Sequence, residues 1–228
     1  MILERGGLRI GLLAYSTTLP QGFAAGPKEA GVNPIRVATT YTPRRNPVEY
    51  PGSEILVITK TNPADRARMK REIRSLKKKT DAVLVYNHWG ASMVHHVHAY
   101  QREIGQAAID AGACAVFGGH QHVLSGIEFY KGKPIVHCTG NWRFDLVEPF
   151  FTDATHPTFL FGCTLTKSGM SKPYILPCRC GIGSAPALLS PRRGEGQEII
   201  RFMEKLCEPF GTGLETQDDR VLLIPPES

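Results

Sequence analysis

The sequence has no long hydrophobic run, and this absence excludes one class of protein at the outset. No eighteen consecutive residues are apolar, whereas a helix that crosses a bilayer needs about twenty such residues. The first residues, Met-Ile-Leu-Glu-Arg-Gly-Gly, also lack the apolar stretch of a signal peptide. We therefore predict no transmembrane segment, and a cytoplasmic location is the default expectation.

Several motifs with known chemistry are lacking as well. The chain has no elbow motif that would expose a serine or cysteine nucleophile, and it has no internal repeats. Cysteine is sparse, with six residues scattered along the chain, and Cys178-Arg179-Cys180 does not have the spacing of a zinc finger. We expect buried thiols in a reducing compartment.

The net charge of +6 comes largely from one predicted helix. Asn62 is expected to be its N-cap, with Pro63 at the first helical position. Its basic residues are Arg66, Arg68, Lys70, Arg71, Arg74, Lys77, Lys78 and Lys79. Such a surface could attract a polyanion, but Asp65 and Glu72 reduce its charge, and we favour a solvated helix flank. Because no aromatic residues interleave with the cations, we exclude nucleic acid as a partner.

The composition is typical of a globular protein, with 42% apolar and 21% charged residues. We predict a single domain over residues 1–228, in which residues 181–196 link the main part to a carboxy-terminal helix and tail. Further strands are expected at 8–15, 54–59, 158–166, 174–180 and 221–224, the last as a short edge strand, and a hairpin is expected over 125–138. Residues 16–50 read as a long surface excursion, in which a short strand could form at Ile35–Ala38.

The most informative stretch runs from Asp81 to Asp145. Ala82–Tyr86 and Ala113–Phe117 read as buried strands, and Tyr100–Ala111 has apolar residues at helical spacing. Gly112 is suited to end that helix. A strand, a helix and a second strand form a crossover unit, so the two strands should be parallel and the connection right-handed.

Three histidines lie where these strands end. His88 follows the first strand, and His120 and His122 follow the second in Gly118-Gly119-His120-Gln121-His122. The carboxyl ends of parallel strands meet at one edge of a sheet, where open α/β sheets bind ligands. Neutral imidazole binds zinc, manganese and iron, and in an extended segment residues i and i+2 point the same way. The two glycines would allow a sharp turn there.

These blocks resemble a known family. The residues are His88-Trp89-Gly90, Ala108-Ile109-Asp110-Ala111-Gly112-Ala113, the Gly-x-His-x-His-Val turn, Gly126-Ile127-Glu128-x-Tyr130-x-Gly132-Lys133-Pro134-Ile135 and Gly140-Asn141-x-x-x-Asp145. They look like the CapA capsule-synthesis (poly-γ-glutamate biosynthesis) family, which is similar in fold to calcineurin-like metallophosphoesterases. The resemblance implies an α/β fold, a layered α/β/β/α sandwich, and His88, His120 and His122 as ligands in a two-metal site.

The chain departs from the family's pattern at its start. The family begins with a strand that carries a metal-binding aspartate, followed by Asn-Leu-Glu and Asn-Asn-His segments, and none of these occurs here. Gly7–Tyr15 resembles the family's middle hairpin, so we expect a fold truncated at the amino end. Two-metal sites usually also need a bridging carboxylate, so three histidines supply an incomplete site.

For several other polar residues the sequence allows both a functional and a structural interpretation. By resemblance Asn141 lies near the site and could bind substrate by orienting a ligand oxygen, although we favour an Asx-type turn. His95, His96 and His98 are clustered in the loop that leads into the predicted helix at 100–111. This clustering suggests a metal or substrate contact, but the rings in a flexible loop need not point to one centre. His137 lies in a predicted strand, where a lone histidine is usually hydrogen-bonded packing.

The resemblance implies a metal-dependent protein of poly-γ-glutamate or other capsule-polymer synthesis, and a metallophosphoesterase-like hydrolase is one form this could take. Divalent manganese, zinc or iron ions would polarise phosphate or carboxylate oxygens of an anionic small molecule or polymer, and a metal-bound water would be the nucleophile in any hydrolysis. The alternatives are a non-catalytic accessory or binding subunit that needs a partner chain for the missing ligands, and an inactive fragment.

Overall fold

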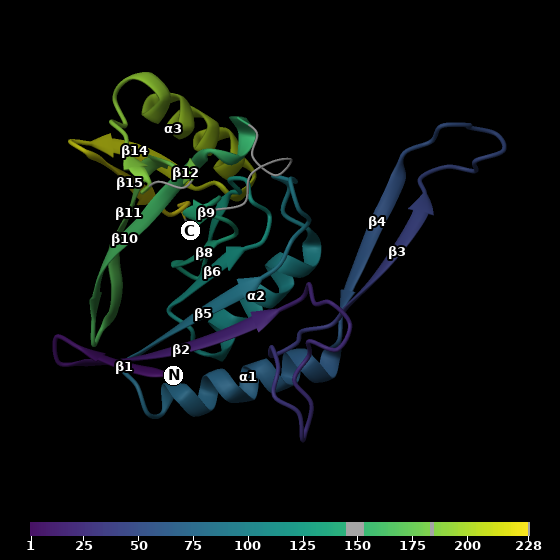
Figure 1. Ribbon diagram of the computed structural model, residues 1–228, viewed down its shortest axis with the longest axis horizontal. Helices are drawn as coiled ribbons and strands as arrows, with labels where there is room; N and C mark the ends of the chain where they lie inside the picture. The colour runs from purple at the N-terminus through teal and green to yellow at the C-terminus, as the bar shows by residue number, and fades with distance from the viewer. Residues whose placement is uncertain (145–152, 183–184, 228) are drawn as a thin grey trace.

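The computed structural model describes residues 1–144, 153–182 and 185–227. In this part of the chain, two sheets and three α-helices form a body, and a two-stranded arm projects from it (Figure 1). The predicted α/β class is confirmed.

The main sheet has six strands in the order β1-β2-β5-β6-β8-β7. Strands β2, β5, β6 and β8 are mutually parallel, and β1 and β7 are antiparallel to their neighbours. Their bounds are β1 Ile2–Arg5, β2 Leu8–Ser16, β5 Ala82–His88, β6 Ala115–Gly119, β7 Ile127–Tyr130 and β8 Lys133–Val136. The parallel pairing of β5 and β6, the hairpin of β7 and β8, and the strand predicted at 8–15 are confirmed.

Helices α1 (Pro63–Lys77) and α2 (Ala99–Ala111) cover one face of this sheet (Figure 1). The apolar stripe of each helix faces the sheet: Met69 and Ile73 from α1 and Ile104 and Ala108 from α2 lie in one buried cluster with Val83 of β5. Removing such side chains from water is the main stabilising contribution of this layer.

The ends of both helices agree with the sequence. The Asn62 side-chain oxygen accepts hydrogen bonds from the amides of Ala64 and Asp65, as expected of an N-cap before Pro63. Gly112 ends α2 with a φ of 115°, a left-handed conformation that glycine adopts without steric cost.

The second sheet has the order β10-β11-β15-β14, with β13 also pairing β11. Its strands are β10 Pro157–Thr166, β11 Gly169–Arg179, β13 Ala187–Leu188, β14 Gly213–Gln217 and β15 Arg220–Ile224. The main sheet and this sheet meet where the Phe117 and Phe161 rings lie 5.2 Å apart. Helix α3 (Gly194–Cys207) completes a second core through Ile199, Ile200 and Met203.

The carboxy-terminal third differs from the prediction in two details. The strand predicted at 221–224 is not at the sheet edge, because β14, which the sequence pattern did not reveal, lies outside it. Residues 181–196, predicted to be a linker, include β13, the start of α3 and the short strand β12 (Gly181–Ile182), which pairs with β9 (Arg143–Phe144). Two single turns, Asp153–Thr155 and Glu208–Phe210, complete the described elements.

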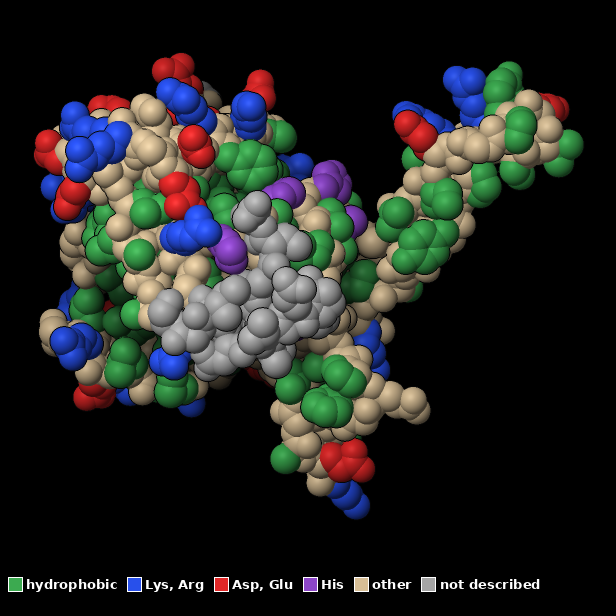
Figure 2. Space-filling model, turned by 45° about the horizontal axis from the view of Figure 1, so that its top comes forward, with side chains coloured by type: hydrophobic (Ala, Val, Ile, Leu, Met, Phe, Trp, Pro, Cys, Tyr) green, Lys and Arg blue, Asp and Glu red, His purple; other side chains and the backbone are tan. Residues whose placement is uncertain are grey.

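The strand predicted at 54–59 is confirmed, but the excursion predicted over residues 16–50 contains a longer strand than the short one expected at Ile35–Ala38. Residues Val37–Pro43 form strand β3, which pairs with β4 (Ile55–Thr61) in antiparallel register, Val37 opposite Thr61 and Pro43 opposite Ile55. This two-stranded arm stands away from the body (Figure 1), and its apolar side chains are visible on the surface (Figure 2).

Two remaining expectations can be compared with the described residues. Cys138, Cys178, Cys180 and Cys207 are buried, as expected of packed thiols. Among the described residues, no helix has the length and apolar character needed to span a bilayer.

Candidate functional site

His88 is the last residue of β5, in the middle of the main sheet. It lies opposite Gly119 of β6 and opposite Ser16 of β2 in the parallel register. Its backbone oxygen accepts a hydrogen bond from the Thr17 amide at 2.9 Å. The sheet therefore fixes His88 from both sides, and its ring stands at the carboxyl edge.

His120 and His122 follow β6 in a strained turn rather than in an extended segment. Their φ angles are 99° and 62°, in the region that residues with a side chain rarely adopt. Such residues persist only where surrounding contacts hold them, and they are common at binding sites. The expectation that these side chains align because the segment is extended is wrong, since the turn itself aims the two rings.

The glycines before the turn act through close packing. A Cβ atom on Gly118 would overlap the His137 carbonyl oxygen and the Trp89 indole nitrogen, and one on Gly119 would overlap the Tyr86 hydroxyl. Neither glycine has a positive φ. Strand β6 thus ends against crowded neighbours, and the histidines that follow supply the sharp turn.

The three imidazoles lie together at this edge. The ring centroids of His88 and His120 are 4.6 Å apart, and those of His120 and His122 are 6.1 Å apart. The predicted meeting of the two strand ends therefore brings these side chains within reach of one another.

The surroundings favour neutral rings. Burial lowers the pKa of His88, and proximity to His122 lowers it further. Burial also lowers the pKa of His120, with further contributions from His88 and His122. Partial burial and crowding of like groups both disfavour the charged form. Near neutral pH these rings therefore keep a nitrogen lone pair, which a metal ligand requires.

Asn141 orients His122. Its side-chain oxygen lies 2.9 Å from His122 Nδ1, and its side-chain nitrogen donates to the Thr155 carbonyl oxygen at 3.4 Å. Because an amide oxygen only accepts hydrogen bonds, Nδ1 of His122 is the donor in this contact. Instead of closing the favoured Asx-type turn, this amide fixes the tautomer and direction of the ring, a common arrangement around metal-binding histidines.

Asn87 is a buried polar residue that the sequence reading did not single out. It is fully buried one position before His88, and within the described residues its side-chain nitrogen and oxygen have no hydrogen-bond partner. An unpaired buried amide costs about 1–3 kcal/mol, so it is unusual. The signal in the sequence was an asparagine that interrupts the apolar run of β5.

A buried ionic group centred on Glu128 packs next to the strand ends that carry the histidines. Trp89 donates from its indole nitrogen to the His137 carbonyl oxygen at 2.9 Å, and His137 Nε2 lies 3.4 Å from Glu128. Arg102 and Gln106 of α2 also donate to this carboxylate. Burial tends to raise the pKa of Glu128, but the hydrogen bonds from His137, Arg102 and Gln106 outweigh it and hold the pKa at about 2.

The predicted role of His137 as hydrogen-bonded packing is confirmed, and the histidines of the loop before α2 make contacts of their own. His95 Nδ1 lies 2.7 Å from the Leu124 carbonyl oxygen, and its ring meets the Phe202 ring edge-on. His96 and His98 approach each other to 5.4 Å between ring centroids.

The donor set fits a divalent transition metal in kind but not in number. A zinc–nitrogen bond is about 2.0–2.1 Å, so two imidazoles on one ion have ring centroids on the order of 5–6 Å apart, close to the spacings at this edge. In the described ranges, however, no three histidine, cysteine, aspartate or glutamate side chains are arranged to hold an ion. Asp145 lies outside the described residues. The described residues by themselves therefore do not complete a metal site.

Comparison with known proteins gives a family match over most of this region. The model of the family described as bacterial capsule synthesis protein PGA_cap matches residues 1–146. That range contains the three histidines and Asn141, and it ends before β10.

Similar proteins match over shorter segments. The chain is 40% identical over 83 residues to the PGA biosynthesis protein CapA of Bacillus subtilis (strain 168), which covers 36% of this chain and 22% of that protein. It is 36% identical over 69 residues to the capsule biosynthesis protein CapA of Bacillus anthracis, covering 30% and 17%. It is 25% identical over 158 residues to the "Probable polyglutamine synthesis accessory protein" of Mycobacterium tuberculosis (strain CDC 1551 / Oshkosh), covering 66% and 40%. The chain thus spans less than half the length of each.

Proposed function

Because the chain belongs to the bacterial capsule synthesis protein PGA_cap family, we propose that it takes part in the synthesis of a capsule polymer of the poly-γ-glutamate type. We further propose that His88, His120 and His122 bind a divalent metal ion. The names of the similar proteins support the first part. The observation that carries the second is the approach of His120 to both His88 and His122 at the carboxyl edge of the sheet.

Each residue has a distinct task in this proposal. His88 and His120 supply lone pairs because burial disfavours their protonated forms. Asn141 holds the Nδ1 proton of His122, so that His122 presents Nε2. A divalent manganese, zinc or iron ion, when bound, would act as a Lewis acid on phosphate or carboxylate oxygens. The ligand is accordingly an anionic small molecule or polymer.

The test is a metal-binding measurement on purified protein. The chain is incubated with Mn²⁺ or Zn²⁺ and dialysed, and retained metal is measured by mass spectrometry. The wild type should retain metal, and His120→Ala and His122→Ala should each lose it, because each removes a donor. His96→Ala is the matched control, since His96 is an exposed histidine outside the trio. Equal retention by all four proteins would disprove the metal site.

The second candidate is an accessory subunit without turnover of its own. Two observations favour it: the described residues by themselves do not complete a metal site, and the β3–β4 arm exposes apolar side chains that suit a protein partner. In this role a partner chain would add the remaining ligands. Assays with p-nitrophenyl phosphate and bis(p-nitrophenyl) phosphate in the presence of Mn²⁺ separate the candidates, since retained metal without hydrolysis favours the accessory role.

A further inference from the structure

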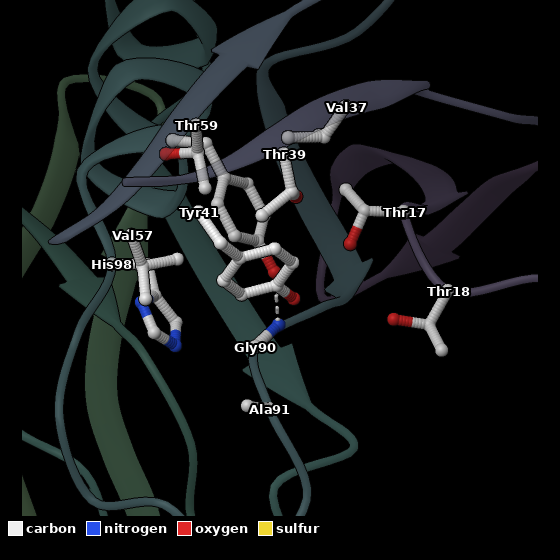
Figure 3. Close-up of a pocket in the computed structure, with 11 residues that line it drawn as sticks. Thr17, Thr18, Val37, Thr39, Tyr41, Val57, Thr59, Gly90, Ala91 and His98 are labelled. Atoms are coloured by element: carbon white, nitrogen blue, oxygen red, sulfur yellow. Dashed lines mark hydrogen bonds between the residues drawn. The ribbon is translucent and has the colours of Figure 1, made fainter. Parts of the chain in front are cut away.

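A pocket of about 380 Å³ lies at the base of the arm, beside the histidine edge. One wall is the face of the arm that carries Thr39, Tyr41 and Thr59, and Gly90 lies across from it (Figure 3). Tyr100 also lines the pocket. The pocket is within the range of about 300–1,000 Å³ that is typical of small-molecule sites.

The register of the arm explains why one face of it lines the pocket. Tyr41 pairs with Val57 and Thr39 pairs with Thr59, and side chains of paired residues share a face of the two-stranded sheet. The alternate pair, Thr40 and Ile58, faces the other way and does not line the pocket.

The lining is rich in hydroxyl groups and poor in charge. Among the described residues, no lysine, arginine, aspartate or glutamate lines the pocket, and six lining residues carry hydroxyl groups: Thr17, Thr18, Thr39, Thr59, Tyr41 and Tyr100. In the described part of the chain, the hydroxyls of Thr39, Thr59 and Tyr41 make no hydrogen bond. The Tyr100 hydroxyl accepts from the Gly90 amide at 2.6 Å, which leaves its own proton to donate.

Aromatic surface accompanies these hydroxyls. Tyr41 lines the pocket and is 69% exposed. Tyr100 is buried, and its ring stacks on that of His98 with 6.1 Å between the ring centroids. An exposed tyrosine offers a rigid apolar face with a polar tip. The pocket therefore combines donors and acceptors with a flat surface for C–H groups.

Three classes of ligand fit this lining poorly. A carboxylate or phosphate would meet no cation, a metal ion would find one imidazole, and a purely apolar group would leave hydroxyls unpaired. A neutral ring that carries several hydroxyl groups satisfies both the hydroxyls and the aromatic face. We infer that this pocket binds a neutral hydroxylated ring of the hexopyranose type, either as a single sugar or as one unit of a glycan.

The pocket is joined to the histidine edge through the backbone. Thr17, which lines the pocket, donates from its amide to the His88 carbonyl oxygen, and Gly90 follows His88 by two residues. If the proposed metal site is correct, the two sites would hold a neutral ring and an anionic group of one molecule. Sugar binding itself requires no metal at His120.

Saturation-transfer difference NMR on the full chain tests the inference, with methyl β-D-glucopyranoside as the single ring, maltotetraose as the chain and L-glutamate as the anionic probe. We expect transfer to the C–H protons of one or both sugars and none to glutamate. A signal from the tetrasaccharide alone identifies a glycan unit as the ligand, and one from the glucoside identifies a single ring.

Variants place the site. Tyr41→Ala should weaken sugar binding roughly tenfold, and Tyr41→Phe should retain most of it, because the ring remains. Thr59→Val should weaken binding, whereas Thr40→Val, the same change on the opposite face of the arm, should not. His120→Ala should leave sugar binding intact, which separates this inference from the metal proposal. Absence of sugar binding in the wild type, or binding that Tyr41→Ala leaves unchanged in a folded protein, would overturn it.

Discussion

The main sheet and the β3–β4 arm contain similar apolar, β-branched strands, but those of the sheet are buried and those of the arm are exposed. Val83 and Val85 of β5 are completely buried, whereas Ile55 and Ile58 of β4 are 63% and 54% exposed. Strand β5 has parallel neighbours on both sides and helices on one face. The arm has two strands and no further strand partner within the described residues. An apolar β-branched run thus indicates a strand, but burial depends on what packs against it.

The difference in burial between the two regions corresponds to a difference in their proposed functional roles. The rigid sheet holds His88 and the strained turn of His120 and His122 against fixed neighbours, as a site with directed lone pairs requires. The arm contributes one wall of the pocket and exposed surface. If this division is correct, matched substitutions in the two regions should differ sharply, and the following experiments test it from the largest expected effect to the smallest.

Replacement of Trp89 by alanine should give the largest loss of stability. Trp89 is fully buried in the core of the main sheet and donates a hydrogen bond to His137. Truncation of a buried tryptophan costs about 3–5 kcal/mol. Tyr41→Ala on the arm should change the free energy of unfolding by less than about 0.5 kcal/mol. Urea denaturation measures both, and equal losses would show that the arm is part of the cooperative core.

The next largest difference is expected between the ion pairs of the two regions, in how much each contributes to the free energy of unfolding. The pKa of Glu128 is about 2 against an ordinary value of 4.5, so the ionised carboxylate stabilises the fold above pH 4.5. This contribution, on the order of 3 kcal/mol, is lost as the pH falls from 4.5 toward 2. Burial also lowers the pKa of the His137 ring. Acid therefore reduces stability here too, because the ring is protonated more readily in the unfolded chain than in the fold.

Glu128→Gln should therefore reduce stability at pH 7 and flatten its dependence on pH below 4.5. The matched change on the arm is Glu54→Gln, which breaks the exposed Arg44–Glu54 pair and should cost less than about 0.5 kcal/mol. Thermal unfolding from pH 3 to 7 measures both variants. An unchanged acid slope in Glu128→Gln would contradict the assigned role.

Asn141→Ala should weaken metal binding while leaving the fold largely intact. The change removes the acceptor that fixes the tautomer of His122, and loss of such a partner typically reduces metal affinity about 10–100-fold. Asn46→Ala, which removes the side-chain contact to the Val48 amide in the arm loop, is the control and should have no effect on metal. Competition with a chromophoric chelator gives the affinities, and equal values for the two variants would argue against the orienting role.

Limited proteolysis should cleave the arm first, because local opening of its exposed loop costs the least free energy. Arg44 and Arg45 lie where the exposed loop of the arm begins, and such loops open locally at little cost. Trypsin should cut there before it cuts the basic but packed helix α1. Mass spectrometry of early fragments identifies the site. First cleavage within α1 would indicate that the arm is better protected than its exposure implies.

Local signals in the chain were sufficient for much of this architecture. The buried run of β5, the helical spacing of α2 and Gly112 after it predicted a crossover unit, and handedness and parallel pairing then placed three histidines at one edge. A strand at 54–59 was predicted, but the arm was not, because β3 and β4 pair with each other across a loop and leave the main sheet. The position of β14 outside β15 was equally invisible, since pairing partners in sheets are chosen by distant contacts.

At the site, the residue types were predictable and their arrangement was not. Histidine as a donor and the strand ends that carry it follow from the sequence alone, because periodicity and chain topology are local properties. The left-handed turn at His120 and His122, the amide of Asn141 against His122, the unpaired Asn87 and the hydroxyl-lined pocket were decided only in three dimensions. Each depends on side chains brought together from separate elements, and neither composition nor spacing records which of them will meet.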